Sequence, residues 1–212
     1  MPSPPEIEVC GDDLVNVKLA GTGEAAAIAE VLRRETPFLE IVPGIDSVVV
    51  QFDAAKTDGD DVERQLRSII DTGVAHIEPT GELIEIPVVY GGEAGPDFDD
   101  VCKRTGLTPD ELVAMHTGSE YLVELVGFTP GFAFIGGLDS ALNVPRRTEP
   151  RQQVAPGSVG IADGRTGLYA LAVPGGWQLI GRTDAELFNA DRDPPNLLGV
   201  GNRVRFVAVA TP

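Results

Sequence analysis

The chain has 212 residues, of which 42% are hydrophobic and 23% are charged, so its composition is that of a globular protein and excludes disorder of the whole chain. The formal net charge of −17 argues against nucleic acid as a partner, because binding to phosphates needs an excess of Lys and Arg. No apolar run approaches the length of a membrane-spanning helix, and the first residues lack the basic and apolar regions of a secretory signal.

Residues 1–88 alternate strand and helix patterns. Alternating apolar residues predict a strand or hairpin over residues 7–19, and Phe38–Val42 and Ser47–Phe52 flank a Pro-Gly turn as a second hairpin. Apolar residues at helical spacing predict helices over Glu24–Arg34 and Asp58–Thr72, the second ending at Gly73. A strand is expected over Leu83–Tyr90. Two helices among four or more strands indicate a ferredoxin-like α+β sandwich.

The composition changes near residue 88, because residues 89–212 hold 18 of the 25 glycines and 10 of the 12 aromatic side chains. Asp97 is expected to cap a short helix, and Thr108-Pro109-Asp110-Glu111 is the pattern of a capping box that starts another. From Glu120 onward short apolar runs alternate with Gly- and Pro-containing loops, Pro174-Gly175-Gly176 among them, and Leu168, Ala170 and Ala172 alternate as in a strand. This pattern predicts a β-barrel or sandwich over 89–212, after a first domain over 1–88.

Cysteine and histidine are scarce. Cys10 and Cys102 are too few for a disulfide framework, which favours the reducing cytoplasm. His76 and His116 are the only histidines, so no Cys/His cluster has metal-ligand spacing and no metal-binding residue is predicted. A Mg²⁺ site made of carboxylates alone stays open.

The segment Gly127–Phe134 carries three Phe side chains among two glycines and a proline. Phe128 and Phe132 fit one side of a shallow apolar groove, with Pro130 between them and the glycines letting a ligand approach the backbone. They fit equally a Gly-rich corner whose Phe side chains fill the core. The pattern leaves both interpretations open.

The second half of the chain has arginine as its only basic residue type. Arg146, Arg147 and Arg151 form the densest basic cluster, which suits an anionic ligand or pairing with neighbouring carboxylates. Two further pairs, Trp177 with Gln178 and Arg182 with Thr183, offer the groups of a polar small-molecule pocket. Alternatively, Trp177 closes a barrel end. His116 is expected near the C-terminal end of a helix, where a lone histidine is more often structural.

These motifs resemble one family, that of the B subunit of 5-oxoprolinase, also known as allophanate hydrolase subunit 1 and as the kinase inhibitor KipI, of the carboxyltransferase subdomain C/D type. The matching stretches run in order from residue 90 to residue 206: YGGEAGPD, GLTPDELVAMHTGSEY, GFTPGFAFIGGL, VPRRTEPR, GSVGIADGRTGLYA, PGGWQLIGRT and GNRVRF.

The resemblance implies a ferredoxin-like domain followed by a cyclophilin-like β-barrel. It also implies a subunit, inactive alone, of an ATP-dependent complex with C and A subunits that converts 5-oxo-L-proline to L-glutamate. Two alternatives are an inhibitor of a histidine kinase and a subunit of urea-linked allophanate hydrolysis. In this interpretation His116 and Gln178 are the candidates for proton transfer or hydrogen bonding. The contacts to a small anionic substrate are expected from Phe128, Pro130, Phe132, Arg146, Arg147, Arg151, Trp177, Arg182 and Thr183.

Overall fold

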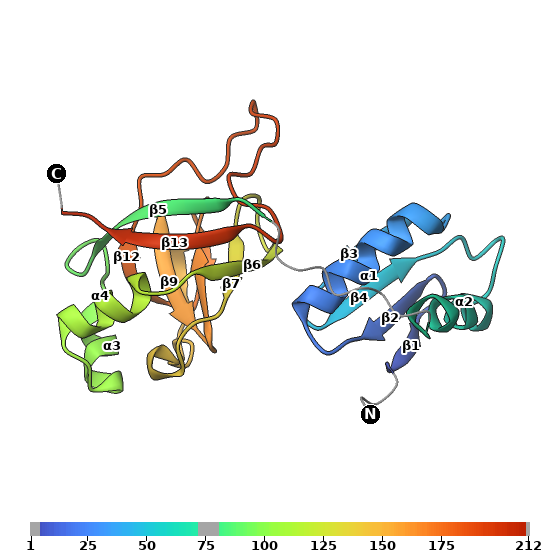
Figure 1. Ribbon diagram of the computed structural model, residues 1–212, viewed down its shortest axis with the longest axis horizontal. Helices are drawn as coiled ribbons and strands as arrows, with labels where there is room; N and C mark the ends of the chain where they lie inside the picture. Colours follow the sequence, from blue (N-terminus) through green and yellow to red (C-terminus); the bar gives the residue numbers. More distant parts are fainter. Residues whose placement is uncertain (1–4, 72–80, 211–212) are drawn as a thin grey trace. The chain divides into compact units, whose positions relative to one another are not determined.

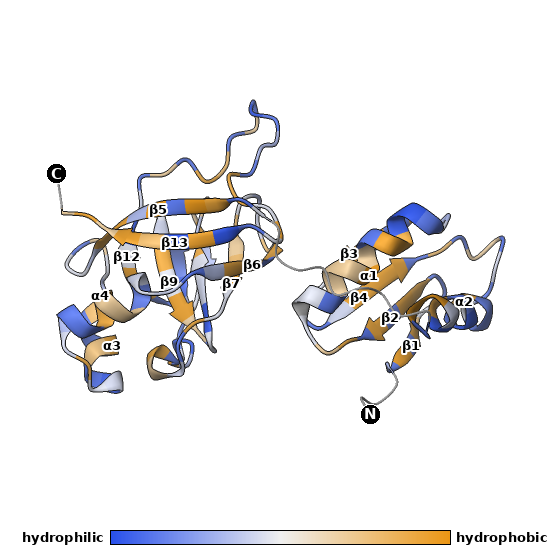
Figure 2. Ribbon diagram, viewed as in Figure 1, coloured by the Kyte–Doolittle hydropathy of each residue, from blue (hydrophilic) through white to orange (hydrophobic). Residues whose placement is uncertain are grey.

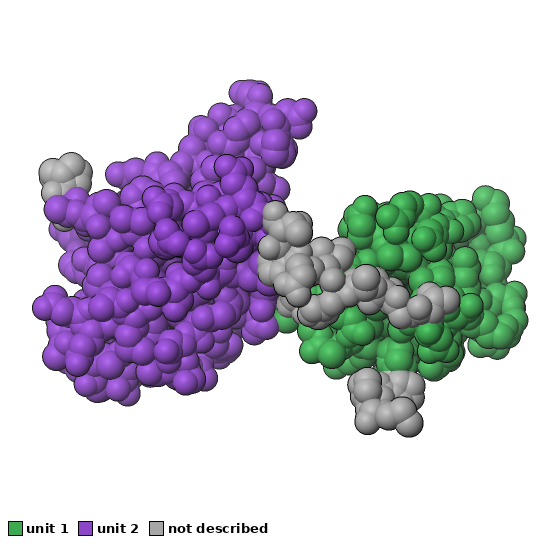
Figure 3. All heavy atoms as spheres, in the orientation of Figure 1, with its two compact units in different colours: residues 1–79 green, residues 80–212 purple. Residues whose placement is uncertain are grey.

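The computed structural model describes residues 5–71 and 81–210 (Figure 1). The chain forms two compact units, Met1–Pro79 and Thr80–Pro212, which Figure 3 colours separately. Within the described ranges, no helix is long and apolar enough to cross a membrane.

The first unit is a four-stranded sheet with two helices. Its strand order is β1-β2-β4-β3, and every neighbouring pair is antiparallel. The elements follow the chain as β1 (Ile7–Cys10), β2 (Leu14–Lys18), α1 (Thr22–Glu35), β3 (Glu40–Pro43), β4 (Ser47–Gln51) and α2 (Gly59–Asp71). Of the strand and the hairpin that residues 7–19 left open, the hairpin forms; the second hairpin and both helices are confirmed, whereas the stop at Gly73 lies outside the described residues. The element order ββαββα is a circular permutation of the βαββαβ order of a ferredoxin-like fold: the strand that comes last in that fold comes first here.

Strand alternation builds the core of this unit. Val15 and Val17 of β2 face the same side as Val48 and Val50 of β4, and all four are fully buried. They pack into one cluster with apolar side chains of both helices, Leu32 of α1 among them. Figure 2 shows the consequence, since β2 and β4 are largely hydrophobic while much of α2 is hydrophilic. The unit is therefore the two-layer α+β sandwich that the sequence predicts.

The second unit is a closed seven-stranded barrel, in the order β10-β7-β6-β13-β5-β12-β9, with a separate two-stranded ribbon of β11 and β8. Two helices and a short 3₁₀ turn, η1 (Ser140–Leu142), complete it. The elements are β5 (Leu83–Tyr90), α3 (Phe98–Thr105), α4 (Pro109–Thr117), β6 (Tyr121–Val126), β7 (Ala133–Gly136), β8 (Arg151–Val154), β9 (Ser158–Ala162), β10 (Arg165–Leu168), β11 (Val173–Gly175), β12 (Gln178–Arg182) and β13 (Arg203–Ala208).

The unit boundary lies between residues 79 and 80, not at residue 88 as composition suggested. The reason is β5, which pairs in parallel with β13 from Leu83↔Arg203 to Val88↔Ala208 and also pairs with β12. A strand with two barrel neighbours belongs to the barrel, whatever the Gly and Pro content of the residues around it.

Three local expectations have different outcomes. The capping box of α4 is confirmed, because the Thr108 side chain accepts from the Glu111 backbone N–H and the Glu111 side chain bonds back to Thr108. The strand pattern over 168–172 is wrong beyond Leu168, where β10 ends. Pro174 and Gly175 lie in the short strand β11 instead of a loop, paired with β8 across an irregular register.

Candidate functional site

An aromatic face lies on the outside of the barrel wall. Along β7 the side chains of Ala133 and Ile135 belong to the barrel core, while Phe134 and the preceding Phe132 pack in a second cluster. Along β12, Ile180 belongs to the barrel core and Leu179 to the second cluster. Because successive strand residues point to opposite faces, the same strands supply the core and this outer face. Tyr169 and Trp177 join the outer cluster.

Two glycines give the rings room to lie against the wall. A Cβ added at Gly167 of β10 would lie 2.8 Å from the Trp177 ring and 3.1 Å from the Phe132 ring. A Cβ at Gly160 of β9 would lie 3.0 Å from the Cβ of Trp177. Glycine inside a strand marks such a close approach, so the aromatic packing depends on both positions.

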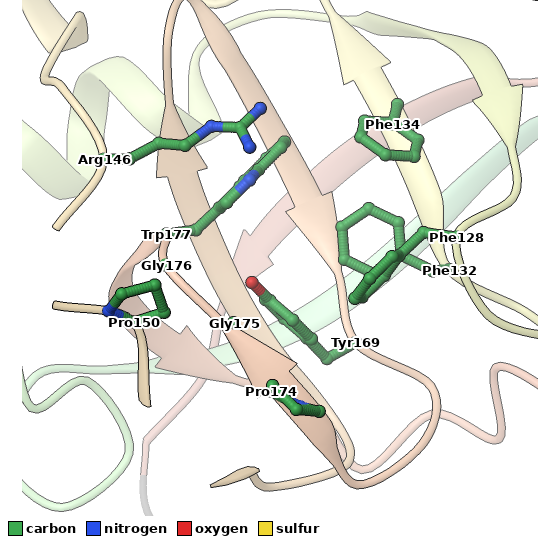
Figure 4. A pocket seen from close by; sticks show the side chains of 10 residues that line it. All are labelled: Phe128, Phe132, Phe134, Arg146, Pro150, Tyr169, Pro174, Gly175, Gly176 and Trp177. Carbon is green, nitrogen blue, oxygen red and sulfur yellow. The ribbon is translucent and has the colours of Figure 1, made fainter. Parts of the chain in front are cut away.

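These rings line a groove of about 340 Å³. In Figure 4, Arg146 and Trp177 lie on one side of it, the Phe side chains lie on the other, and Tyr169 lies between them. Phe132 is the hub, with edge-to-face ring contacts to four other rings at centroid distances between 4.7 and 5.7 Å. The lining residues are Phe128, Phe132, Phe134, Arg146, Pro150, Tyr169, Pro174, Gly175, Gly176 and Trp177.

Phe128 is the exposed aromatic ring at this groove. Its side chain is 63% exposed, whereas Phe132 and Trp177 are buried. Its φ of 68° lies in the left-handed region that bulky residues rarely adopt. Non-Gly residues in such conformations cluster at functional sites, and this one presents a ring to solvent where a ligand would enter.

Arg146 supplies the positive charge at the groove. Its Nε donates to Asp163 Oδ2 over 2.8 Å, and its terminal nitrogens have no hydrogen-bond partner among the described residues. Burial raises the pKa of the nearby Tyr169, and the positive charges of Arg146 and Arg151 oppose that rise. The groove therefore combines apolar walls with a free guanidinium edge, which suits a small ring that carries an anionic group.

Arg147 and Arg151 both pair with a buried carboxylate, although Nη1 of Arg151 is buried with no hydrogen-bond partner among the described residues. The Nη1 of Arg147 and the Nη2 of Arg151 both donate to Oδ1 of Asp97, over 2.9 and 2.8 Å. The Asp97 carboxylate is buried and makes no capping hydrogen bond to α3, although its residue occupies the N-cap position. The sequence predicts Asp97 only as a helix cap, because its local pattern contains no signal for partners fifty residues away.

Gln178 is buried behind the groove. Its side-chain amide donates to the backbone carbonyl of Pro145 over 3.0 Å, so it holds the segment that carries Arg146. Pro130 is exposed on the loop after Phe128 and is not among the residues that line the groove.

His116 lies in the barrel core. Its side chain is fully buried and stacks on Phe206 at a centroid distance of 4.4 Å. Its Nδ1 lies 2.7 Å from the Tyr90 hydroxyl, and its Nε2 lies 3.0 Å from the Thr166 hydroxyl, which itself donates to the Gly160 carbonyl. These partners select the tautomer with the proton on Nε2. Burial lowers the pKa of His116 to about 3, so the ring is neutral and fully bonded near pH 7, and it is not among the groove residues.

Arg182 and Thr183 lie at the other end of β12 from Trp177. Arg182 is exposed and lines two further hollows, of about 420 and 250 Å³, and Thr183 lines the smaller one. Every other arginine has an ion pair, but Arg182 has none with any described carboxylate. The structure thus brings four predicted contact residues to the groove, Phe128, Phe132, Arg146 and Trp177, and places this pair elsewhere. Their binding roles stay predictions.

Comparison with known proteins places these residues in context. The family model "Carboxyltransferase domain, subdomain C and D" matches residues 5–198. The 5-oxoprolinase B subunit of Escherichia coli O157:H7 is 42% identical over 191 residues, covering 90% of this chain and 87% of the relative. The 5-oxoprolinase B subunit of Bacillus subtilis (strain 168) is 37% identical over 207 residues, covering 92% of this chain and 86% of the relative.

Two solved structures share the fold. The crystal structure of TTHA0988 has a TM-score of 0.79 and 31% identity over 94% of this chain, which spans 40% of that longer one. The urea carboxylase of Kluyveromyces lactis has a TM-score of 0.78 at 18% identity, over 97% of this chain and 22% of its own. The latter likeness concerns the fold alone.

Proposed function

Because the chain belongs to the family of the carboxyltransferase domain, subdomain C and D, and is a relative of 5-oxoprolinase B subunits, we propose that it holds the substrate in a 5-oxoprolinase complex. Membership of such a complex follows from these relatives, which match most of the chain. The finer proposal is that the complex converts 5-oxo-L-proline to L-glutamate with ATP, that the C and A subunits are the partners, and that this chain is inactive without them. The cytoplasm is the proposed location, in keeping with two free cysteines.

One observation supports substrate binding in the groove: an aromatic hollow lies beside a guanidinium whose terminal nitrogens have no partner in the described ranges. 5-Oxo-L-proline is a five-membered ring with a carboxylate on one carbon. The exposed ring of Phe128 can receive the lactam ring against the wall that Phe132 and Trp177 line, and Arg146 can hold the carboxylate through two parallel N–H···O bonds. Binding through the ring and the carboxylate orients the lactam carbonyl and leaves its oxygen free for activation.

The reaction needs activation, because a lactam carbonyl is a poor electrophile. Transfer of the terminal phosphoryl group of ATP to the lactam oxygen yields ADP and an activated imidate. Water adds to the activated carbon, and the ring C–N bond breaks to release the amine. A second water then displaces phosphate and leaves the side-chain carboxylate of glutamate. ATP and its accompanying Mg²⁺ enter this scheme as substrate, and the described residues contain no group of three or more His, Cys, Asp or Glu that could hold a metal ion.

The lining of the groove contains no general base for these steps. Among its ten residues the ionisable side chains are Arg146, which stays charged, and Tyr169, whose pKa is raised by burial. A site that binds and orients but cannot accept a proton near pH 7 is consistent with chemistry completed by partner subunits. Arg182, which has no described carboxylate partner at the far end of β12, is retained as a proposed second anion contact.

Binding to the isolated chain tests the groove. Trp177 is the only Trp of the chain and lines the groove, so its fluorescence reports on ligands directly. We expect 5-oxo-L-proline to bind saturably, and its affinity to fall about tenfold or more in Arg146→Met, a loss on the scale of one charge-assisted contact. Thermal stability should stay unchanged, because this side chain is exposed. Equal binding by the variant would refute the assigned contact.

Reconstitution tests the complex. The chain mixed with the C and A subunits of the same source should hydrolyse ATP only when 5-oxo-L-proline is present. The chain alone should hydrolyse neither ATP nor 5-oxo-L-proline. Absence of substrate-dependent ATP hydrolysis from the full set would overturn the proposed activity. Turnover by the purified chain alone would overturn its role as a dependent subunit.

A further inference from the structure

Asp97 is a buried carboxylate with no assigned role. It is 4% exposed and stands directly before α3, whose Val101 N–H bonds to its backbone carbonyl. An aspartate at this position usually caps its helix with its side chain. Here no such capping bond forms, so the carboxylate is used for something other than the helix.

The carboxylate joins separate segments of the second unit. Its Oδ2 accepts from the Leu179 backbone N–H over 2.7 Å, and the Asp97 N–H donates back to the Leu179 carbonyl over 3.0 Å. Its Oδ1 accepts from Arg147 and Arg151 over 2.9 and 2.8 Å. One side chain thus fastens the start of α3 to β12 and to residues 147–151.

These attachments stand next to the groove without entering it. Arg146 and Pro150 line the groove, and each is the chain neighbour of an arginine that Asp97 holds. Leu179 follows Trp177 by two residues on the same side of β12. A direct bond from the Arg147 N–H to the Gly176 carbonyl, 2.7 Å long, draws the two sides together.

From this geometry we propose that Asp97 is a positioning residue, which determines where the Arg146 side chain lies relative to the aromatic rings that line the groove. The proposal rests on the proposed binding of a carboxylate-bearing lactam in the groove. Asp97 pairs with both Arg147 and Arg151 through one carboxylate oxygen, keeps these two arginines away from the residues that line the groove, and leaves Arg146 as the anion contact. Charge-assisted bonds to a buried carboxylate are among the stronger ones, and removing the charge leaves two partly buried guanidinium groups without a counter-ion.

The test substitution is Asp97→Asn, which keeps the shape and removes the charge. Its matched control is Asp100→Asn on the same helix, which breaks the exposed pair with Arg104 and touches no residue that lines the groove. Binding of 5-oxo-L-proline is compared with binding of 2-pyrrolidinone, the same ring without the carboxylate, through Trp177 fluorescence. Circular dichroism shows that each variant is folded at the assay temperature.

If Asp97 positions Arg146, its substitution should change the ratio of the affinity for 5-oxo-L-proline to the affinity for 2-pyrrolidinone. We expect Asp97→Asn to weaken 5-oxo-L-proline by about tenfold or more and to leave 2-pyrrolidinone within about twofold, so that the preference for the carboxylate is lost. Asp100→Asn should keep that preference. If Asp97→Asn keeps it, or weakens both ligands equally as a purely structural residue would, the proposal is overturned.

A second readout separates this proposal from the proposed function. Trp177 is 5% exposed, and displacement of residues 146–150 should raise its quenching by acrylamide by at least about twofold in Asp97→Asn but not in Asp100→Asn. If the wild type binds neither ligand, the proposed function fails, and unchanged quenching in the folded variant then overturns the positioning role as well. If Asp97→Asn does not fold, Arg147→Met removes one of the two guanidinium contacts and receives the same measurements.

Discussion

Acid should destabilise this protein through His116. Burial in the folded chain lowers the pKa of this ring to about 3, whereas a histidine in the unfolded chain has its ordinary pKa of 6.5. Between these values the unfolded state binds one more proton than the folded state, so the free energy of unfolding falls as the pH falls. One pH unit is worth about 1.4 kcal/mol. Two of the three pH units between pH 7.5 and pH 4.5 lie below the ordinary value of 6.5. This residue therefore accounts for a loss of about 3 kcal/mol over that range.

Urea unfolding of the wild type and of His116→Gln at the two pH values measures this contribution. Carboxylates titrate in both proteins and cancel, so the wild type should lose about 3 kcal/mol more than the variant. The amide of Gln can still accept a hydrogen bond at one end and donate at the other. Equal losses in the two proteins would refute the reasoning.

Nuclear magnetic resonance of the wild type gives a check that does not depend on the variant folding. The chain has two histidines, and His76→Gln identifies their signals in protein labelled on the imidazole ring. The His116 signal should keep its neutral position down to pH 4.5. Titration of this signal between pH 6 and 7 would show that the ring is accessible to protons and would remove the basis of the stability calculation.

Two further predictions concern the groove wall and the helix that carries His116. Gly167→Ala should displace the Trp177 and Phe132 rings, since the new Cβ would lie 2.8 Å from one and 3.1 Å from the other; near-ultraviolet circular dichroism should change, and an unchanged spectrum would contradict the close approach. Thr108→Ala should cost about 1 kcal/mol of stability by removing the capping box of α4, measured by urea unfolding, and a loss below about 0.3 kcal/mol would show that the cap contributes little.

Local pattern was sufficient for most elements. The two hairpins and two helices of the first unit, and the capping box before α4, follow from spacing and from turn residues. Pro174 was one local failure, besides the strand pattern beyond Leu168, because its Pro-Gly-Gly sequence is typical of a loop, yet residues 173–175 pair with β8. Pairing between distant segments decides such cases, and no short window of sequence contains it.

The candidate site was predictable in part for the same reason. The spacing of Phe128 and Phe132 left a groove wall and a core-filling corner open, and in the structure both rings line the groove while only Phe128 is exposed. The arginine cluster fitted either an anionic ligand or pairing with carboxylates, and only the contacts to Asp97 separate Arg147 and Arg151 from Arg146. Identical side chains acquire different tasks because one buried carboxylate reaches two of them and an exposed one reaches the third.

The sequence by itself determined the charge of the chain, its family motifs, most of its helices and strands, and which residues alternate along each strand. Alternation separates two faces but does not say which face is enclosed. Closure of the barrel decided that, burying Ile135 of β7 in the core and turning Phe134 to the outer cluster with Trp177. The same closure enclosed His116 and left Arg146 beside the groove, so the tertiary structure decided which polar side chains fill the interior and which can meet a ligand.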